Sequence, residues 1–89
     1  MPRWSVRIEA KAEKDLGRLG TQDRSRVLRF LHQRLADLPN PRLLGASLSG
    51  PLAGLWKYRV GDIRIIAEIR DRELVVLVIE IGNRRDVYR

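Results

Sequence analysis

The sequence predicts a small α+β domain in which two N-terminal helices form a hairpin packed on an antiparallel sheet, in the order β-α-α-β-β-β. Three observations predict this class: apolar and polar residues alternate early in the chain, apolar residues then follow a helical spacing, and three short apolar segments close the chain. The chain has 89 residues, 44% of them apolar, which is enough for one modest core. We therefore expect a single domain spanning residues 1–89.

The N-terminal half predicts one strand and two helices. Residues 4–9 alternate between apolar and polar side chains, as a half-buried strand does. The spacing of apolar residues is helical over about 10–19 and again over about 21–38. Thr21 or Asp23 can cap the second helix, because both side chains accept hydrogen bonds from free backbone N–H groups.

The C-terminal half predicts a loop followed by three strands. Prolines and glycines mark residues 39–54 as a connecting loop, with room for a short extended piece at 46–48. The expected strands are 55–60, 63–70 and 74–81. Two-residue turns at 61–62 and 71–72 join them. The last strand is apolar on both faces, so we expect it inside the sheet and not at an edge.

The first turn fixes which residues face each other in this hairpin. Arg59 is then opposite Arg64, and Tyr58 is opposite Ile65. The face that should receive the helices carries Trp56, Tyr58, Val60, Ile63, Ile65 and Ala67. Lys57, Arg59 and Arg64 share the other face. Since opposed like charges destabilise a sheet, this basic patch predicts a bound anion.

The end of the chain adds more positive charge near this patch. The same register puts Ile79 beside Arg64, so the last strand leaves the sheet close by. Arg84 or Arg85, together with Tyr88, can fold back to make a pocket with four cations and one phenol. The alternative is a solvated, merely basic sheet face with a frayed tail.

Charge composition points to a polyanionic partner. The chain carries 18 Lys and Arg against 11 Asp and Glu, for a net charge of +7. Fifteen of the basic residues are Arg, whose planar fork grips phosphate bidentately. Nucleic acid is one partner that fits, and an acidic protein is another. A GC-rich genome, which spells basic residues with Arg codons, would produce the same bias without any partner.

Several classes of site and location are disfavoured. The chain has no Cys and a single histidine, His32, so it offers no disulfide, no thiolate nucleophile and no Cys- or multi-His metal centre. We expect no cofactor. The longest apolar run, residues 74–79, is far too short to span a membrane, and the N-terminus does not resemble a signal peptide. A cytoplasmic protein without membrane contact is expected.

The sequence resembles the toxins of the RelE/ParE superfamily, which belong to bacterial and archaeal toxin–antitoxin operons. The similarity covers essentially the whole chain, and two stretches carry most of it: LWKYRVGDIRII at 55–66 and IGNRRDVY at 81–88. In the RelE branch the fold is a microbial-ribonuclease-like sheet with two N-terminal helices. Its members cut messenger RNA in the ribosomal A site.

This resemblance implies a set of site residues. Lys57 and Arg59 match the paired basic positions of the second strand of the RelE branch, and Arg64 matches the arginine of the third. The implied catalytic set is Lys57, Arg59, Arg64, Arg84 and Tyr88, with Arg85 and Arg89 as RNA- or ribosome-binding residues. Two departures stand out: Asn83 occupies a position where many relatives have His, and one residue follows Tyr88, which leaves no room for a C-terminal helix.

The resemblance also implies an activity and partners. The expected activity is that of a metal-independent, ribosome-dependent endoribonuclease, an mRNA interferase that inhibits translation. The expected partners are a cognate antitoxin, the 70S ribosome with its mRNA, and operator DNA only through the antitoxin complex. Two rivals remain: a ParE-like inhibitor of DNA gyrase without nuclease activity, and a catalytically degenerate RNA- or ribosome-binding module. ParE relatives generally lack the full basic set, which favours RNA cleavage.

The remaining conspicuous residues have plainer interpretations. We expect His32 at the surface or at its boundary with the core, and Trp4, Trp56 and Tyr58 in or against the core. The second helix carries Arg24, Arg26, Arg29 and Arg34, which form a solvated face or else contact ribosomal RNA phosphates or an acidic antitoxin.

Overall fold

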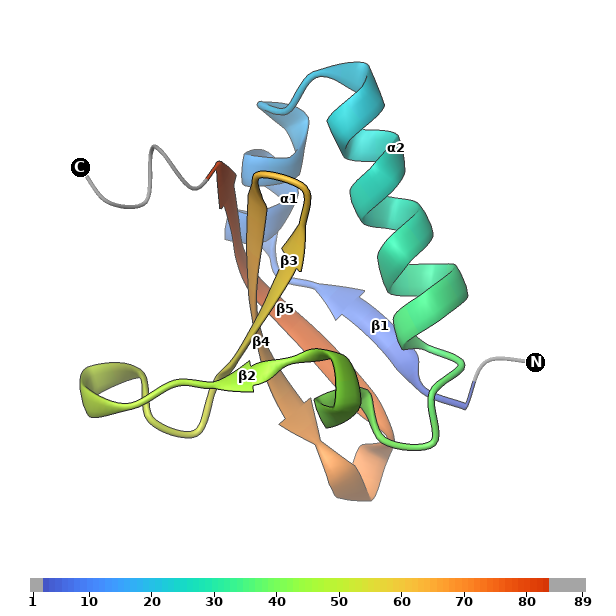
Figure 1. The fold of residues 1–89 in the computed structure, drawn as a ribbon, viewed down its shortest axis with the longest axis vertical. Coiled ribbons are helices and arrows are strands. Elements are labelled where there is room, and N and C mark those ends of the chain that lie inside the picture. Colours follow the sequence, from blue (N-terminus) through green and yellow to red (C-terminus); the bar gives the residue numbers. More distant parts are fainter. Residues whose placement is uncertain (1–2, 84–89) are drawn as a thin grey trace.

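A computed structural model describes residues 3–83 and shows a five-stranded sheet with its helices on one face (Figure 1). The strands are β1 (Ser5–Ile8), β2 (Ala46–Ser47), β3 (Trp56–Val60), β4 (Ile63–Arg70) and β5 (Val75–Asn83). The helices are α1 (Ala10–Gly17) and α2 (Thr21–Arg29), and a π-helical segment, Phe30–Leu35, continues α2. Short 3₁₀ turns occupy Pro41–Leu44, Gly50–Leu52 and Asp71–Glu73. The predicted α+β class is confirmed.

The sheet is mixed, which corrects the prediction of a wholly antiparallel sheet. The strand order is β1-β5-β4-β3-β2, and β1 pairs in parallel with β5, from Ser5 opposite Val75 to Ile8 opposite Val78. The remaining pairs are antiparallel. Strand β5 lies between β1 and β4, so the interior place expected for the most apolar strand is confirmed.

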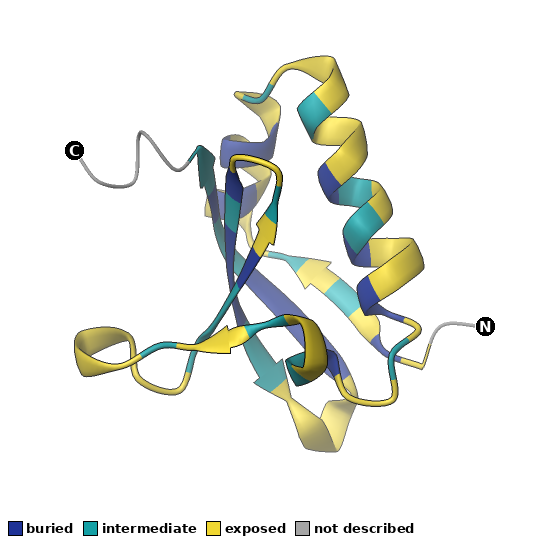
Figure 2. Ribbon diagram, in the orientation of Figure 1, coloured by how far each residue is buried: buried dark blue, intermediate teal, exposed yellow. Residues whose placement is uncertain are grey.

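The core lies between the helices and one face of the sheet (Figure 2). The helical segments contribute Ala12, Leu16, Val27, Leu31 and Leu35, and the sheet contributes Tyr58, Ile63, Ile65, Ala67, Val76, Val78 and Ile81. Trp56 and Val60 pack at its margin, and Trp4 is buried within it. The predicted apolar face of the β3–β4 hairpin and the predicted packing of the aromatic residues are therefore confirmed.

The start of α2 differs from its prediction. Gly20 occupies the N-cap position and no side chain caps the helix, so capping by Thr21 or Asp23 was wrong. Asp23 lies instead in the first turn, where a negative charge interacts favourably with the helix dipole.

The end of the second helix is also irregular. Regular α-helix ends at Arg29, and wider turns continue to Leu35. Ala36 N–H donates to the carbonyl oxygen of Leu31, five residues earlier, at 3.1 Å. Leu31 and Leu35 are both fully buried, so the wider turns keep the apolar stripe on the sheet.

The β3–β4 hairpin has the predicted register. Arg59 is opposite Arg64, and Tyr58 is opposite Ile65. Gly61, the first residue of the turn, has a φ of 60°, a backbone conformation that glycine adopts without steric cost.

The register of β4 with β5 differs from its prediction. Gly82, and not Ile79, lies beside Arg64. Two features cause the shift. The connection between the strands is a 3₁₀ turn that ends with Leu74 in the left-handed conformation, longer than the two-residue turn predicted. A β-bulge also interrupts the ladder between Ile66 and Ala67.

The loop over 39–54 packs onto the hairpin, and its predicted extended piece is β2, which pairs with β3. The Tyr58 hydroxyl donates to the Pro41 carbonyl oxygen at 2.8 Å. Arg42 makes two hydrogen bonds to the Asp71 carboxylate, at 3.0 and 2.8 Å, and its guanidinium lies 5.6 Å from the Trp56 ring centroid. These contacts join the loop to β3 and to the β4–β5 turn. Within residues 3–83, no helix has the length and apolar character that crossing a membrane requires.

Candidate functional site

The basic patch predicted on the hairpin is present in the structure. Lys57 and Arg59 lie on β3 and Arg64 lies on β4, with Arg59 directly opposite Arg64. Their neighbours Tyr58, Ile63 and Ile65 point into the core, so alternation along the strands directs the three basic side chains to the other face. We call Lys57, Arg59 and Arg64 the basic sheet cluster.

The three members of this cluster differ in exposure. Arg59 is exposed, whereas Lys57 and Arg64 are half-buried. The Nε atom of Arg64 is enclosed by the protein. A guanidinium held in this way keeps its position, and fixed cations stabilise developing negative charge better than mobile ones. The arrangement suits an anion placed over the sheet at the level of Arg64.

The end of β5 lies next to this cluster. Gly82 pairs with Arg64 and adds no side chain beside it, and Asn83 pairs with Ile63. The end of β5 therefore lies closer to the cluster than in the predicted register, which put Ile79 beside Arg64. The other predicted site residues, Arg84, Arg85, Tyr88 and Arg89, lie outside the residues that the structure describes. The pocket of four cations and one phenol remains a prediction.

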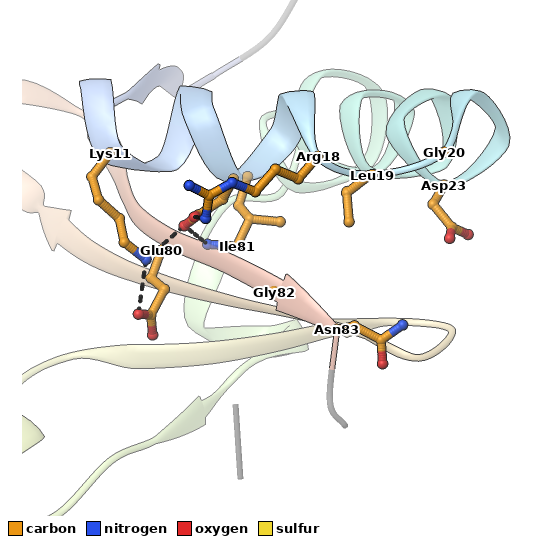
Figure 3. Close-up of a pocket in the computed structure, with 10 residues that line it drawn as sticks. Lys11, Arg18, Leu19, Gly20, Asp23, Glu80, Ile81, Gly82 and Asn83 are labelled. Atoms are coloured by element: carbon orange, nitrogen blue, oxygen red, sulfur yellow. Dashed lines mark hydrogen bonds and ion pairs between the residues drawn. The ribbon is translucent and has the colours of Figure 1, made fainter. Parts of the chain in front are cut away.

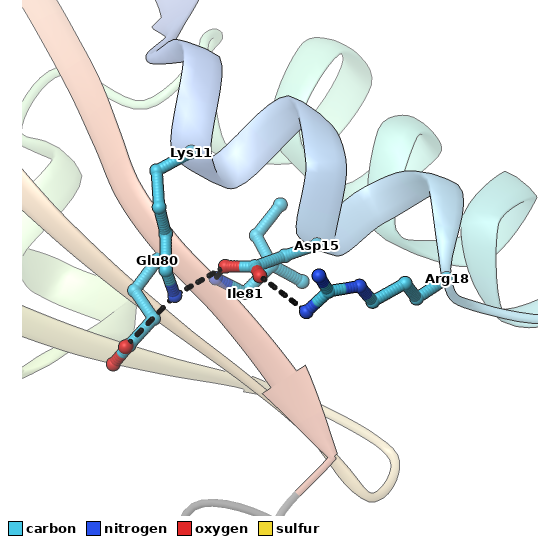
Figure 4. Close-up of polar contacts among 5 residues, drawn as sticks. All are labelled: Lys11, Asp15, Arg18, Glu80 and Ile81. Carbon is cyan, nitrogen blue, oxygen red and sulfur yellow. Dashed lines mark hydrogen bonds and ion pairs between the residues drawn. The ribbon is translucent and has the colours of Figure 1, made fainter.

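A buried carboxylate holds the end of β5 in place (Figure 4). Asp15 on α1 is 7% exposed, and its Oδ2 atom accepts a hydrogen bond from the backbone N–H of Ile81 at 3.1 Å. Strand β1 pairs with β5 only as far as Val78, so Asp15 replaces a neighbouring strand as the acceptor for this N–H group. The position of the strand leading to Gly82 therefore depends on Asp15.

Positive side chains surround this carboxylate. Lys11 Nζ lies 2.8 Å from Asp15 Oδ2 and 3.0 Å from Glu80 Oε1, and the pKa of Lys11 is raised by its hydrogen bonds to Asp15 and Glu80. Arg18 Nη1 lies 4.0 Å from Asp15 Oδ1. Asp15 was not predicted as a functional residue from the sequence. The sequence feature that could have revealed it is an acidic residue within the apolar stripe of the first helix, next to Leu16 and three residues after Ala12.

A cavity of about 510 Å³ opens beside this carboxylate (Figure 3). Its lining combines Lys11 and Arg18 with Asp15, Asp23 and Glu80, and it includes Gly82 and Asn83 from the end of β5. The charges are mixed, so the cavity does not select a polyanion. Over residues 3–83, no three His, Cys, Asp or Glu side chains are grouped as a metal site would require.

Other titratable candidates lie away from the cluster. His32 is exposed, as predicted, and lines a different hollow with Trp4 and Glu73. Tyr58 is 1% exposed, and burial raises its pKa to about 12, with Arg42 opposing that shift weakly. A buried phenol engaged with a carbonyl oxygen is a structural group and not an RNA contact, in agreement with its predicted place in the core.

Comparison with known proteins assigns the chain to a family. Residues 6–88 match the family described as ParE toxin of type II toxin-antitoxin system, parDE. Toxin RelE of Mycobacterium tuberculosis is 36% identical over 86 residues, which cover 97% of this chain and 87% of that protein. The chain belongs to the RelE/ParE superfamily of toxins. The resemblance inferred from the sequence is confirmed.

Other proteins similar to this RelE/ParE toxin support the same assignment. Toxin RelG of M. tuberculosis is 29% identical over 86 residues, 97% of each chain. The toxin–antitoxin complex RelBE2 of M. tuberculosis contains a chain that superimposes with a TM-score of 0.85 at 26% identity, over 93% of both chains. The archaeal RelE–RelB complex of Pyrococcus horikoshii gives a TM-score of 0.71 at 26% identity, over 92% of this chain and 96% of that one.

Proposed function

We propose that this toxin is a ribosome-dependent endoribonuclease that cleaves mRNA in the ribosomal A site and so inhibits translation. The observation that carries the proposal is the basic sheet cluster: Lys57, Arg59 and Arg64 lie on one face of a rigid hairpin, with Arg59 opposite Arg64. These three positions belong to the catalytic set that the RelE resemblance implies, which supports the proposal. The curated relatives that match over almost the whole chain are RelE and RelG toxins.

The chemistry requires a nucleophile from the RNA itself. The ribose 2′-oxygen forms a bond to the adjacent phosphorus, the bond from phosphorus to the 5′-oxygen breaks, a base takes the 2′-hydroxyl proton, and an acid protonates the leaving oxygen. Arg59 and Arg64 would bind the non-bridging oxygens, whose negative charge grows in the transition state. One preorganised donor of this kind is typically worth about 3 kcal/mol. Cationic side chains, and not a metal ion, would neutralise the phosphate.

The base is the more demanding role. Asn83 cannot transfer a proton in place of the His of many relatives. Lys57 or Tyr88 would have to serve. Lysine and tyrosine side chains ordinarily keep their proton at neutral pH, so the isolated toxin should be a weak nuclease. Orientation of the mRNA by the ribosome would then supply much of the rate.

A cognate antitoxin is the proposed protein partner. The solved RelBE2 and RelE–RelB complexes each pair a toxin with an antitoxin. A toxin with a net charge of +7 suits an acidic partner that neutralises it. In the cytoplasm, operator DNA would be bound only through this complex.

Primer extension on a reporter mRNA after brief expression tests the nuclease proposal. Wild type should produce new cuts confined to the translated region, and Arg64→Gln should reduce them about 10²- to 10³-fold. Arg72→Gln is the matched control, because Arg72 is exposed on the β4–β5 turn and is removed from the cluster. Cleavage that survives Arg64→Gln at the level of the control would contradict the proposal.

Inhibition of DNA gyrase is the second candidate, and the match to the ParE toxin family favours it. Plasmid DNA from the same cells separates the two activities. Growth arrest with an intact message and relaxed or broken plasmid would identify a gyrase inhibitor. Growth arrest with a cut message and normally supercoiled plasmid is the result expected for the nuclease.

A further inference from the structure

A second group of arginines lines a groove at the edge of the sheet. The groove has a volume of about 520 Å³ and lies between the second helix and the tip of the β3–β4 hairpin, which stand next to each other in Figure 1. Its basic lining residues are Arg26, Arg29, Arg34 and Arg59; Phe30, Gln33, Val60 and Gly61 complete it. We call it the arginine groove.

The charge of the groove is positive and uncompensated over the described residues: no carboxylate of residues 3–83 lines it. Arg26 has Asp23 at 3.8 Å, an exposed pair of little strength. Within residues 3–83, Arg29, Arg34 and Arg59 have no carboxylate partner. Four like charges around one hollow repel each other, and a solvated helix face ordinarily mixes both signs to avoid this cost.

The helix and the hairpin hold the walls of the groove in fixed positions. The Phe30 ring packs on Tyr58, with centroids 6.0 Å apart, which ties the helix to β3. Arg26 lies against the turn so closely that a β-carbon on Gly61 would be 2.8 Å from Arg26 Nη2. Arg26, Arg29, Phe30, Gln33 and Arg34 all line the groove, so this side of the helix faces it. They come from successive turns, which provides donors along the length of the groove.

Arg59 belongs to both basic surfaces. It lines the groove, and it is opposite Arg64 in the basic sheet cluster. Strand β2 pairs with β3 only at Trp56 and Lys57, so within residues 3–83 no strand pairs with this edge of β3 at Arg59. Arg59 is therefore the residue that connects the basic sheet cluster to the arginine groove.

We propose that the arginine groove binds the phosphodiester backbone of the same RNA strand whose scissile phosphate lies on the basic sheet cluster. The identity of this RNA strand rests on the proposed function. The phosphates of one strand fit a succession of bidentate arginine forks, and the shared residue Arg59 makes one continuous strand the occupant that reaches both surfaces. An acidic polypeptide would match the charge of the arginine groove, but nothing would require it to extend onto the basic sheet cluster as well.

Binding of non-cleavable RNA tests the groove without depending on catalysis. Fluorescence anisotropy would compare 2′-O-methylated RNAs of about three and about twelve nucleotides, lengths below and within the site sizes typical of single-strand binders. The test variant is Arg29→Gln/Arg34→Gln. The control is Arg3→Gln/Arg72→Gln, which removes two exposed arginines that also lack a carboxylate partner in the described part of the chain.

For the longer RNA, loss of two phosphate contacts should lower the slope of log K against log salt by about 1.4 and weaken binding about 25-fold near 0.1 M salt. The control and the short RNA should change little. Arg29→Lys/Arg34→Lys, which keeps both charges, should retain the slope. These binding changes are expected even if the toxin cuts no message. Failure of the cleavage proposal and failure of RNA binding in the groove are therefore separate results.

Three results would overturn the inference. In the first, the test variant binds the longer RNA as tightly as the control does. In the second, the short RNA loses as much affinity as the longer one, which would make the groove an independent phosphate site. In the third, polyglutamate displaces the longer RNA from wild type as well as unlabelled RNA of equal charge does, which would assign the groove to an acidic protein segment.

Discussion

Removal of the Asp15 side chain should destabilise the toxin by an amount that can be worked out from its contacts. In Asp15→Ala the N–H of Ile81 loses its acceptor, and because Ile81 is 2% exposed, water cannot replace it readily. A buried donor left without a partner costs about 1–3 kcal/mol. The ion pair with exposed Lys11 adds about 0.3–0.5 kcal/mol, as helical pairs four residues apart do. Together the two losses amount to about 1.3–3.5 kcal/mol.

Urea unfolding followed by circular dichroism measures this loss. With a slope in the lower part of the usual 1–3 kcal/mol/M range, the midpoint should fall by about 1–2 M. Thermal unfolding should shift by roughly 10–20 °C for a domain of this size. Amide exchange at Ile81 should accelerate more than exchange at Val76, which is deep in the same strand and bonded within the sheet.

Two further variants make this argument refutable. Asp15→Asn keeps an oxygen acceptor for Ile81 and loses only the charge, so it should cost less than about 1 kcal/mol. Glu13→Ala removes an exposed carboxylate from the same helix and should change stability by less than about 0.5 kcal/mol. A loss of stability in Asp15→Ala no larger than in Glu13→Ala, or a loss in Asp15→Asn equal to that in Asp15→Ala, would contradict this role of Asp15.

Three other predictions concern the contact between the loop and Tyr58. Tyr58→Phe should cost about 1–2 kcal/mol in urea unfolding, because the Pro41 carbonyl loses its donor at a buried position. Alkaline titration should show a second effect: the folded-state pKa of Tyr58 is about 12 against about 10 unfolded, so its stabilisation is complete below pH 10 and is lost between pH 10 and 12, by about 2–3 kcal/mol. Tyr58→Phe should abolish that part of the loss, and an unchanged alkaline profile would contradict the assignment. Gly45→Ala should cost about 1–3 kcal/mol, because its β-carbon would lie 2.9 Å from a ring carbon of the buried Tyr58. Gly17→Ala is the control: it has open space around it and should be neutral or stabilising in the same unfolding assay.

The parts of the fold that follow from local patterning were predicted from the sequence. Alternation and a Gly-containing two-residue turn determine the β3–β4 hairpin, and with it the placement of Lys57, Arg59 and Arg64 on one face. The unbroken apolar run of β5 predicted its interior place, because such runs are typical of strands with a neighbouring strand on each side.

The features that the sequence did not reveal depend on contacts between distant segments. The parallel pairing of β1 with β5 depends on how the helical hairpin packs on the sheet. No local sequence pattern encodes the direction of this pairing. The bulge near Ala67 and the longer turn before β5 moved Gly82 into the position predicted for Ile79, since a register error propagates along the whole strand.

The candidate site shows the same division. The basic sheet cluster is local to one hairpin, so spacing alone predicted it. Asp15 acts on Ile81, a residue 66 positions away, and the arginine groove combines residues of the second helix with Arg59 and Gly61. Both arrangements arise from packing of the helices on the sheet, which periodicity predicts in outline but not in detail.

Cleavage of a defined mRNA on purified 70S ribosomes tests the central claim most directly. The toxin should cut the message at the A-site codon when ribosomes are present and cut the free message poorly. Arg64→Gln should lose this activity and Arg72→Gln should retain it. An uncut message on programmed ribosomes, or equal cutting by Arg64→Gln, would contradict the account and shift the assignment to gyrase.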